Sequence, residues 1–189
     1  MKRTICLILA FAGILIIACN NPKKVSKEIS TIQEISTIQD IEGNVYKTVK
    51  IGKQVWIAEN LRTTKYNDGT AIPMVTDNTA WLDLTTPAYC FYRINSEIVN
   101  KIKYGALYNW FTVSTNKLCP AGWHVPTDTD WTTLITYLGG DSVAGGKLKE
   151  VGTTDWDSPN TGATNETGFT ALPSGSCTDR FYNSGMFGY

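Results

Sequence analysis

A short apolar segment at the start of the chain limits how much of the sequence can fold as a domain. Lys2 and Arg3 precede an uncharged run of fourteen residues from Thr4 to Ile17. A helix of that length rises about 21 Å, which is less than the roughly 30 Å hydrocarbon core of a bilayer. A positive start before such a run is typical of a secretory signal peptide. We therefore expect the rest of the chain to fold outside the cytoplasm, as one domain.

A cysteine directly follows this segment. The sequence Ile16-Ile17-Ala18-Cys19 resembles the lipobox of bacterial lipoproteins. The resemblance implies that residues 1–18 are a lipoprotein signal peptide, cleaved before Cys19, and that Cys19 is acylated. Each buried CH₂ contributes about 0.8 kcal/mol to membrane binding, so several acyl chains would anchor the protein firmly. An ordinary secretory signal with an incidental cysteine is the alternative.

The lipobox also implies a location in the bacterial cell envelope, with the membrane as the partner of Cys19. Asn20 stands where Asp would retain a lipoprotein in the inner membrane. We therefore expect the outer membrane, with the protein on its periplasmic or its surface side.

The charge balance excludes a nucleic-acid binder. Lys and Arg number 17, Asp and Glu also number 17, and the pI is near 6.6. Loss of residues 1–18 removes Lys2 and Arg3 and leaves the mature chain at −2. Aromatic residues make up 11% of the chain and charged residues only 18%, which does not fit a disordered protein.

Residues 19–39 differ in character from the rest of the chain. The hexapeptide at residues 30–35 is repeated almost unchanged at residues 36–41, with isoleucine at every third position. That period fits neither a strand nor a helix. We interpret residues 19–39 as the lipidated cysteine and a flexible tether. A short strand-forming docking segment is the alternative.

Residues 40–189 are expected to form one α+β, loop-rich domain. Alternation over residues 45–51, a Gly52-Lys53 turn and residues 54–57 predict a hairpin. Apolar residues spaced i, i+3, i+4, i+7 predict a helix at residues 104–111. A second helix is predicted to begin after a capping box of Thr127 and Asp130 and to end at Gly139. A short third helix is predicted at residues 143–149. The intervening run 67–87 and the segment 150–189 are expected to be dominated by loops and turns.

Five aromatic-rich segments follow one another in the domain: residues 55–61, 104–110, 118–126, 130–131 and 165–169. Together they resemble the Fibrobacter succinogenes major paralogous domain, a family of bacterial cell-surface and secreted modules. The resemblance implies a fold similar to C-type-lectin-like and formylglycine-generating-enzyme-like folds, without an established catalytic activity. Family members continue into a further closing strand, so we expect this domain to be incomplete at its C-terminus.

Three cysteines remain after Cys6 is removed with the signal peptide and Cys19 is acylated. Cys90, Cys119 and Cys177 are disulfide candidates in an oxidising compartment. Cys90 could pair with Cys119, or Cys177 with either. The family resemblance implies that the partner of Cys119 belongs to the terminal strand that this chain lacks.

The sequence offers no catalytic constellation. His124 is the only histidine, which excludes a multi-histidine metal cluster, and we expect its ring to be hydrogen-bonded between Trp123 and the Thr127 cap. The six tryptophans, Trp131 above all, are expected in the core. The resemblance to formylglycine-generating oxidases implies a reactive cysteine pair, but no local motif identifies one here. We expect no enzyme and no catalytic residue.

One loop combines oxygen ligands with an aromatic ring. Lectin-like folds use such groups to hold Ca²⁺ and stack on sugars. Ordinary turn architecture is the alternative interpretation. The candidate ligand-binding residues are Asp155, Trp156, Asp157, Asn160, Asn165 and Glu166.

These observations predict a lipid-anchored envelope protein that displays a non-catalytic module for a glycan or a surface protein. No cofactor is expected beyond the Ca²⁺ of the candidate loop. The alternatives are an envelope enzyme related to formylglycine-generating oxidases and a decayed, non-functional paralogue.

Overall fold

The computed structural model describes residues 36–91, 93–94, 97–98 and 101–175. The predicted signal peptide, the predicted acylation site Cys19, the disulfide candidate Cys177 and residues 176–189 lie outside these ranges. Contacts group the described residues into one compact unit. None of the helices in the described ranges has the length and hydrophobicity needed to cross a bilayer.

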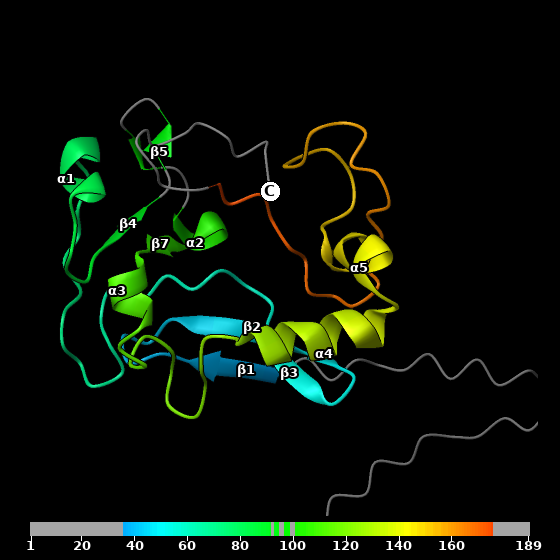
Figure 1. The fold of residues 1–189 in the computed structure, drawn as a ribbon, viewed down its shortest axis with the longest axis horizontal. Coiled ribbons are helices and arrows are strands. Elements are labelled where there is room, and N and C mark those ends of the chain that lie inside the picture. Colours follow the sequence, from blue (N-terminus) through cyan, green and yellow to red (C-terminus); the bar gives the residue numbers. More distant parts are fainter. Residues whose placement is uncertain (1–35, 92, 95–96, 99–100, 176–189) are drawn as a thin grey trace, which may run out of the picture. The chain divides into compact units, whose positions relative to one another are not determined.

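The described part of the chain mixes short helices with small antiparallel sheets, joined by long loops (Figure 1). This agrees with the α+β, loop-rich prediction. One sheet has the order β1-β2-β3, and two further sheets pair β4 with β7 and β5 with β6. The elements are β1 Ser36–Gln39, β2 Val45–Ile51, β3 Gln54–Ile57, α1 Asn78–Leu82, β4 Tyr89–Phe91, β5 Arg93–Ile94, β6 Glu97–Ile98, α2 Lys101–Tyr104, β7 Ala106–Tyr108, α3 Trp110–Val113, α4 Asp128–Leu138 and α5 Asp141–Leu148.

The predicted hairpin is confirmed. β2 and β3 pair in antiparallel register, from Thr48 opposite Ile57 to Ile51 opposite Gln54. Gly52 makes the turn with a φ of 62°, a conformation that favours glycine. The side chains of β2 that face the core include Val49 and Ile51.

Strand β1 lies within the segment that we interpreted as tether. Ser36 to Gln39 pair with Thr48 to Val45 of β2. Only Ile38 of this strand is partly buried, so backbone pairing rather than side-chain packing positions it. Because side-chain periodicity does not report backbone pairing, the isoleucine spacing gave no indication of the strand. The strand-forming alternative holds for these four residues.

The predicted helix over residues 104–111 is wrong. The segment contains the end of α2, strand β7 and the start of α3. Gly105 separates α2 from β7 with a φ of 67°, and a Cβ atom there would lie 2.6 Å from both Asn60 Cβ and the Leu61 carbonyl oxygen. Asn109 then caps α3 by accepting a hydrogen bond from the Thr112 amide. A helix α1 also occurs in the run expected to be loop, capped by Asp77.

Helices α4 and α5 were both predicted. Thr127 and Asp130 form the full capping box of α4, and Gly139 ends the helix in the left-handed region with a φ of 101°. Helix α5 spans Asp141–Leu148, two residues earlier than its predicted start.

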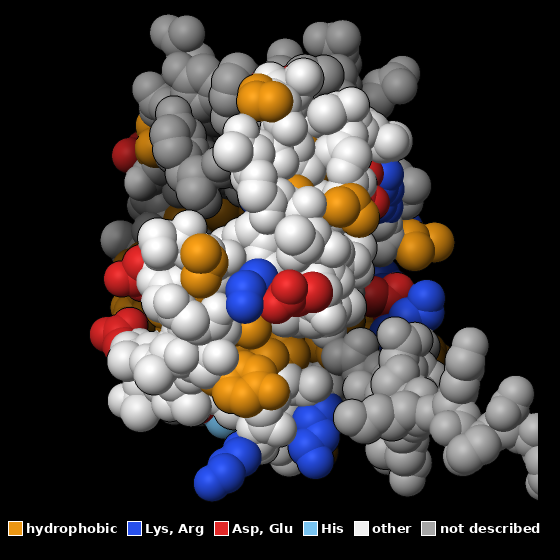
Figure 2. Space-filling model, turned by 90° about the vertical axis from the view of Figure 1, so that its right-hand side faces the viewer, with side chains coloured by type: hydrophobic (Ala, Val, Ile, Leu, Met, Phe, Trp, Pro, Cys, Tyr) orange, Lys and Arg blue, Asp and Glu red, His pale blue; other side chains and the backbone are white. Residues whose placement is uncertain are grey.

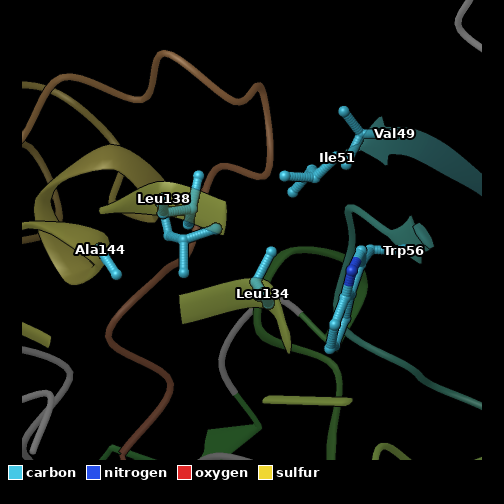
Figure 3. Close-up of a cluster of buried hydrophobic side chains, with 7 residues drawn as sticks. Val49, Ile51, Trp56, Leu134, Leu138 and Ala144 are labelled. Carbon is cyan, nitrogen blue, oxygen red and sulfur yellow. The ribbon is translucent and has the colours of Figure 1, made fainter. Parts of the chain in front are cut away.

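One core forms where α4 and α5 pack on the hairpin. Figure 3 shows Val49 and Ile51 of β2 and Trp56 of β3 near Leu134 and Leu138 of α4 and Ala144 of α5. Leu134 is completely buried. A second cluster joins Tyr89 and Phe91 of β4 to the buried side chains of Tyr66, Ile72 and Leu118, which lie outside the strands. The loop-rich domain therefore depends on two modest cores rather than on one large sheet.

Two adjacent glycines of α5 provide a test of this packing. A Cβ atom at Gly145 would meet nothing within 4 Å, whereas one at Gly146 would overlap the carbonyl oxygen of Gly162. Gly145→Ala should raise the free energy of unfolding by up to about 1 kcal/mol, because alanine favours the helix. Gly146→Ala should lower it by at least about 1 kcal/mol, because the loop at Gly162 must move. Urea denaturation measures both, and equal shifts of the same sign would contradict the close approach.

Candidate ligand-binding cleft

The predicted ligand loop is held by its own contacts. Asp155, whose side chain is 5% exposed, forms a 2.7 Å ion pair with Lys103 and accepts a 2.8 Å hydrogen bond from the Tyr104 hydroxyl. The Trp156 indole N–H donates to the Ala171 carbonyl at 3.0 Å, and Lys149 Nζ lies 5.1 Å from the Trp156 ring centre. These contacts fix the loop against neighbouring segments.

The remaining loop candidates are also used locally or point to solvent. Asn160 Nδ2 donates to the carbonyls of Glu150 and Gly152. The Asn165 side chain bonds the amide and the hydroxyl of Thr170. Glu166 pairs with Lys147 at 3.0 Å, and Asp157 is exposed.

Loop architecture therefore accounts for most of these side chains. Asn160 and Asn165 both adopt positive φ values, of 45° and 47°, which suit asparagine in turns. In the described ranges, no group of three or more His, Cys, Asp or Glu side chains could hold a metal ion. A calcium site in this loop stays a prediction.

A cleft of about 700 Å³ lies elsewhere, between the end of β3, strand β7, the segment before α4 and the first turn of α4. Its volume falls within the roughly 300–1,000 Å³ of small-molecule sites. All five aromatic-rich segments singled out in the sequence contribute to its lining. The aromatic lining residues are Trp56, Tyr104, Tyr108, Trp123, Trp131 and Phe169.

Three of these rings form a continuous wall. The centres of the Trp56 and Trp131 rings are 4.9 Å apart with the planes at 43°, and those of Trp56 and Phe169 are 6.2 Å apart and nearly perpendicular. Trp56 is buried, and its indole N–H has no hydrogen-bond partner among the described residues.

Trp131 is not the core residue that its helical stripe predicted. Leu134 and Leu138 of the same stripe are buried, but Trp131 is 39% exposed. The stripe runs from the core at the end of α4 to the cleft at its beginning. Helical periodicity cannot separate a core position from a cleft wall, because both lie on one face of the helix.

Polar groups surround the aromatic wall. Gln54 Nε2 donates to the Asp130 carbonyl at 3.1 Å, and Asn60 Nδ2 donates to Ser174 Oγ at 2.7 Å. Glu59 accepts the backbone N–H of Lys47 at 2.6 Å. The cleft thus combines apolar ring faces with amide, hydroxyl and carboxylate groups, as small-molecule sites commonly do.

His124 stands at the rim of the cleft. Its side chain is 70% exposed, and Nε2 lies 3.1 Å from Asp130 Oδ2. The predicted link between the ring and the helix cap therefore exists, but the partner is Asp130 rather than Thr127. Hydrogen bonds from the Thr127 hydroxyl and amide, together with His124, lower the pKa of Asp130 to about 2.

Among the described residues, no disulfide joins Cys90 to Cys119, which is one of the pairings that the sequence left open. Cys119 lines the cleft and carries a free thiol, whose pKa is raised by burial. A raised pKa disfavours the nucleophilic thiolate. Cys90 is completely buried in β4, and Cys177 lies outside the described residues.

Comparison with known proteins gives one finding. The model of the family described as the Fibrobacter succinogenes major domain matches residues 49–189. Neither the curated proteins nor the solved structures provide a match.

The capping box should make stability depend on acid pH. The pKa of Asp130 is lower in the folded state than its ordinary value near 3.8. The ionised carboxylate therefore adds to the free energy of unfolding above pH 3.8, and this stabilisation is lost as the pH falls towards about 2. Denaturation curves measured from pH 7 to pH 2 should show a smaller acid-dependent loss for Asp130→Asn than for the unmodified protein.

Asp128→Asn is the matched control, since Asp128 lies in the same first turn of α4 but outside the capping box. An acid-dependent loss that Asp128→Asn reduces as much as Asp130→Asn would contradict the role given to the box.

Proposed function

The chain belongs to the Fibrobacter succinogenes major domain family, and on that premise we propose that it is a lipid-anchored envelope protein whose lectin-like domain binds a glycan in the aromatic cleft. The observation that carries the proposal is the convergence of five separate segments on one cleft walled by Trp56, Trp131 and Phe169. Binding, not catalysis, is the proposed role.

The wall and the rim would contribute differently to binding. Sugar rings present apolar C–H faces, which pack on the faces of aromatic side chains. Trp131 offers such a face, being partly exposed and held by its contact with Trp56. The polar groups of Asn60, Asp130 and His124 would then accept or donate hydrogen bonds to sugar hydroxyls and fix the orientation of the ring.

The anchor explains why a small binding module would be useful at an envelope. Acyl chains on Cys19 would hold the protein at the membrane. Residues 20–35 would separate the anchor from β1, the first strand of the described domain. Many copies on one surface would bind a polymeric glycan with an avidity greater than that of a single cleft.

Trp131→Ala tests the cleft. Detergent-solubilised full-length protein should be retained by at least one envelope or plant polysaccharide, and the substitution should weaken retention by about 10-fold or more, as expected for an aromatic hot spot of roughly 2 kcal/mol.

Trp110→Ala is the matched control for that experiment. Trp110 is 72% exposed and is not among the residues that line the cleft. Equal loss for both variants, or no retention by any polysaccharide, would contradict glycan binding in the cleft.

Cys19→Ser tests the anchor. The unmodified protein should fractionate with membranes, and its N-terminal proteolytic peptide should begin at Cys19 and carry the additional mass of acyl chains. The Cys19→Ser variant should carry no acyl chains and should bind the membrane more weakly, because a serine hydroxyl cannot form the thioether bond that joins the lipid to the cysteine sulfur. An N-terminal peptide of the unmodified protein that carries no acyl mass on Cys19 would overturn acylation as the means of attachment.

A further inference from the structure

A second cavity adjoins the aromatic cleft, and its size and charges indicate which class of glycan the protein would bind. We propose that the ligand is an uncharged polysaccharide chain that runs from the aromatic cleft into this second cavity. This inference rests on the proposed function and specifies its substrate class and the length of chain that is recognised.

The two cavities share a wall. The second has a volume of about 420 Å³ and lies between β2, the end of β3, the segment around Lys103 and residues 168–172. Four residues line both cavities: Ile57, Glu59, Asn60 and Phe169. A ligand packed against Phe169 in the cleft therefore lies next to the second cavity.

The charges of the aromatic cleft favour an uncharged ligand. Among the described residues that line it, Glu59 and Asp130 carry carboxylates, and none is a lysine or an arginine. Carboxylates accept hydrogen bonds from neutral hydroxyl groups. They repel uronate, sulfate and phosphate groups.

Among the described residues that line the second cavity, two lysines are matched by two carboxylates, so this cavity adds no net positive charge to attract an acidic polymer. Its lysines are Lys47 and Lys103, and its acids are Glu59 and Glu150. Lys103 is neutralised by the buried Asp155 at 2.7 Å. On the face shown in Figure 2, acidic and basic side chains are likewise interspersed within a largely uncharged surface.

The volumes favour a chain over a single sugar. Each cavity alone reaches the size of a small-molecule site of about 300–1,000 Å³. A short oligosaccharide on the Trp131–Trp56 wall would leave the second cavity empty. A longer chain would fill both, and the added contacts would raise its affinity without the entropic cost of a second, separate binding event.

Titration calorimetry on the detergent-solubilised full-length protein tests the proposal. The probes are neutral gluco-, manno- and xylo-oligosaccharides from dimer to hexamer, and galacturonate oligomers of the same lengths as acidic probes. For at least one neutral series, affinity should rise about 10-fold or more from dimer to hexamer, a gain of about 1.4 kcal/mol. That binding should be insensitive to added salt.

A double variant, Lys47→Ala with Ile102→Ala, removes two exposed side chains that line only the second cavity. It should abolish the gain with length and keep the affinity for the dimer. Ile41→Ala with Lys50→Ala is the matched control, since both residues are exposed and line neither cavity. The control should bind like the unmodified protein.

Two results would overturn this inference while leaving the proposed function intact. One is Trp131-dependent binding of neutral oligomers that does not strengthen with length. The other is tighter, salt-sensitive binding of the galacturonate series. Absence of binding to every probe would overturn the proposed function as well.

Discussion

The packing of α4 on the β2–β3 hairpin is the contact on which the rest of the domain depends. Leu134 and Leu138 enter the space over Val49 and Ile51, and they leave Trp131 one turn earlier on the same side of the helix. Trp131 then meets Trp56 where the hairpin ends. The cleft thus lies at one end of this core, and its aromatic wall is formed by Trp56 of the core together with Trp131 and Phe169, which pack against Trp56.

This arrangement joins stability to recognition through shared residues. Asp130 completes the capping box of α4, contacts His124 and lies at the cleft. Asn60 sits beside the close approach of Gly105 and also lines both cavities. A substitution at either residue changes the fold and the site together, so each needs a fold-matched control before its effect is assigned to binding.

The sequence predicts those elements whose determinants are local. The hairpin is predicted by apolar and polar residues that alternate on either side of Gly52. Helix α4 is predicted by a capping box at its start and a glycine at its end, both of which are short sequence patterns. The segment 104–111 has helical spacing, yet its residues 106–108 pair with β4, and Gly105 is pressed against Asn60 and Leu61. Those constraints come from distant parts of the chain, and a local pattern cannot contain them.

The same limit applies to the site. Oxygen-bearing side chains are concentrated in residues 155–166, but the structure shows that these asparagine and aspartate side chains mainly bond their own loop and its neighbours. The cleft residues were visible as aromatic segments, but only the tertiary fold brings them to one place. Trp131 illustrates the difference, because its spacing is that of a core residue and its exposure is that of a binding surface.

The position of β1 has a mechanical consequence. If Cys19 anchors the protein and the cleft holds a ligand, as proposed, tension between the membrane and the ligand would enter the described domain at Ser36, the first residue of β1. It then passes across the β1–β2 and β2–β3 ladders to Trp56 and α4. The backbone hydrogen bonds of an almost unburied strand are therefore the first structure to carry the load. The pairing of this edge strand, rather than the packing of the core, would set the force that the anchored domain withstands.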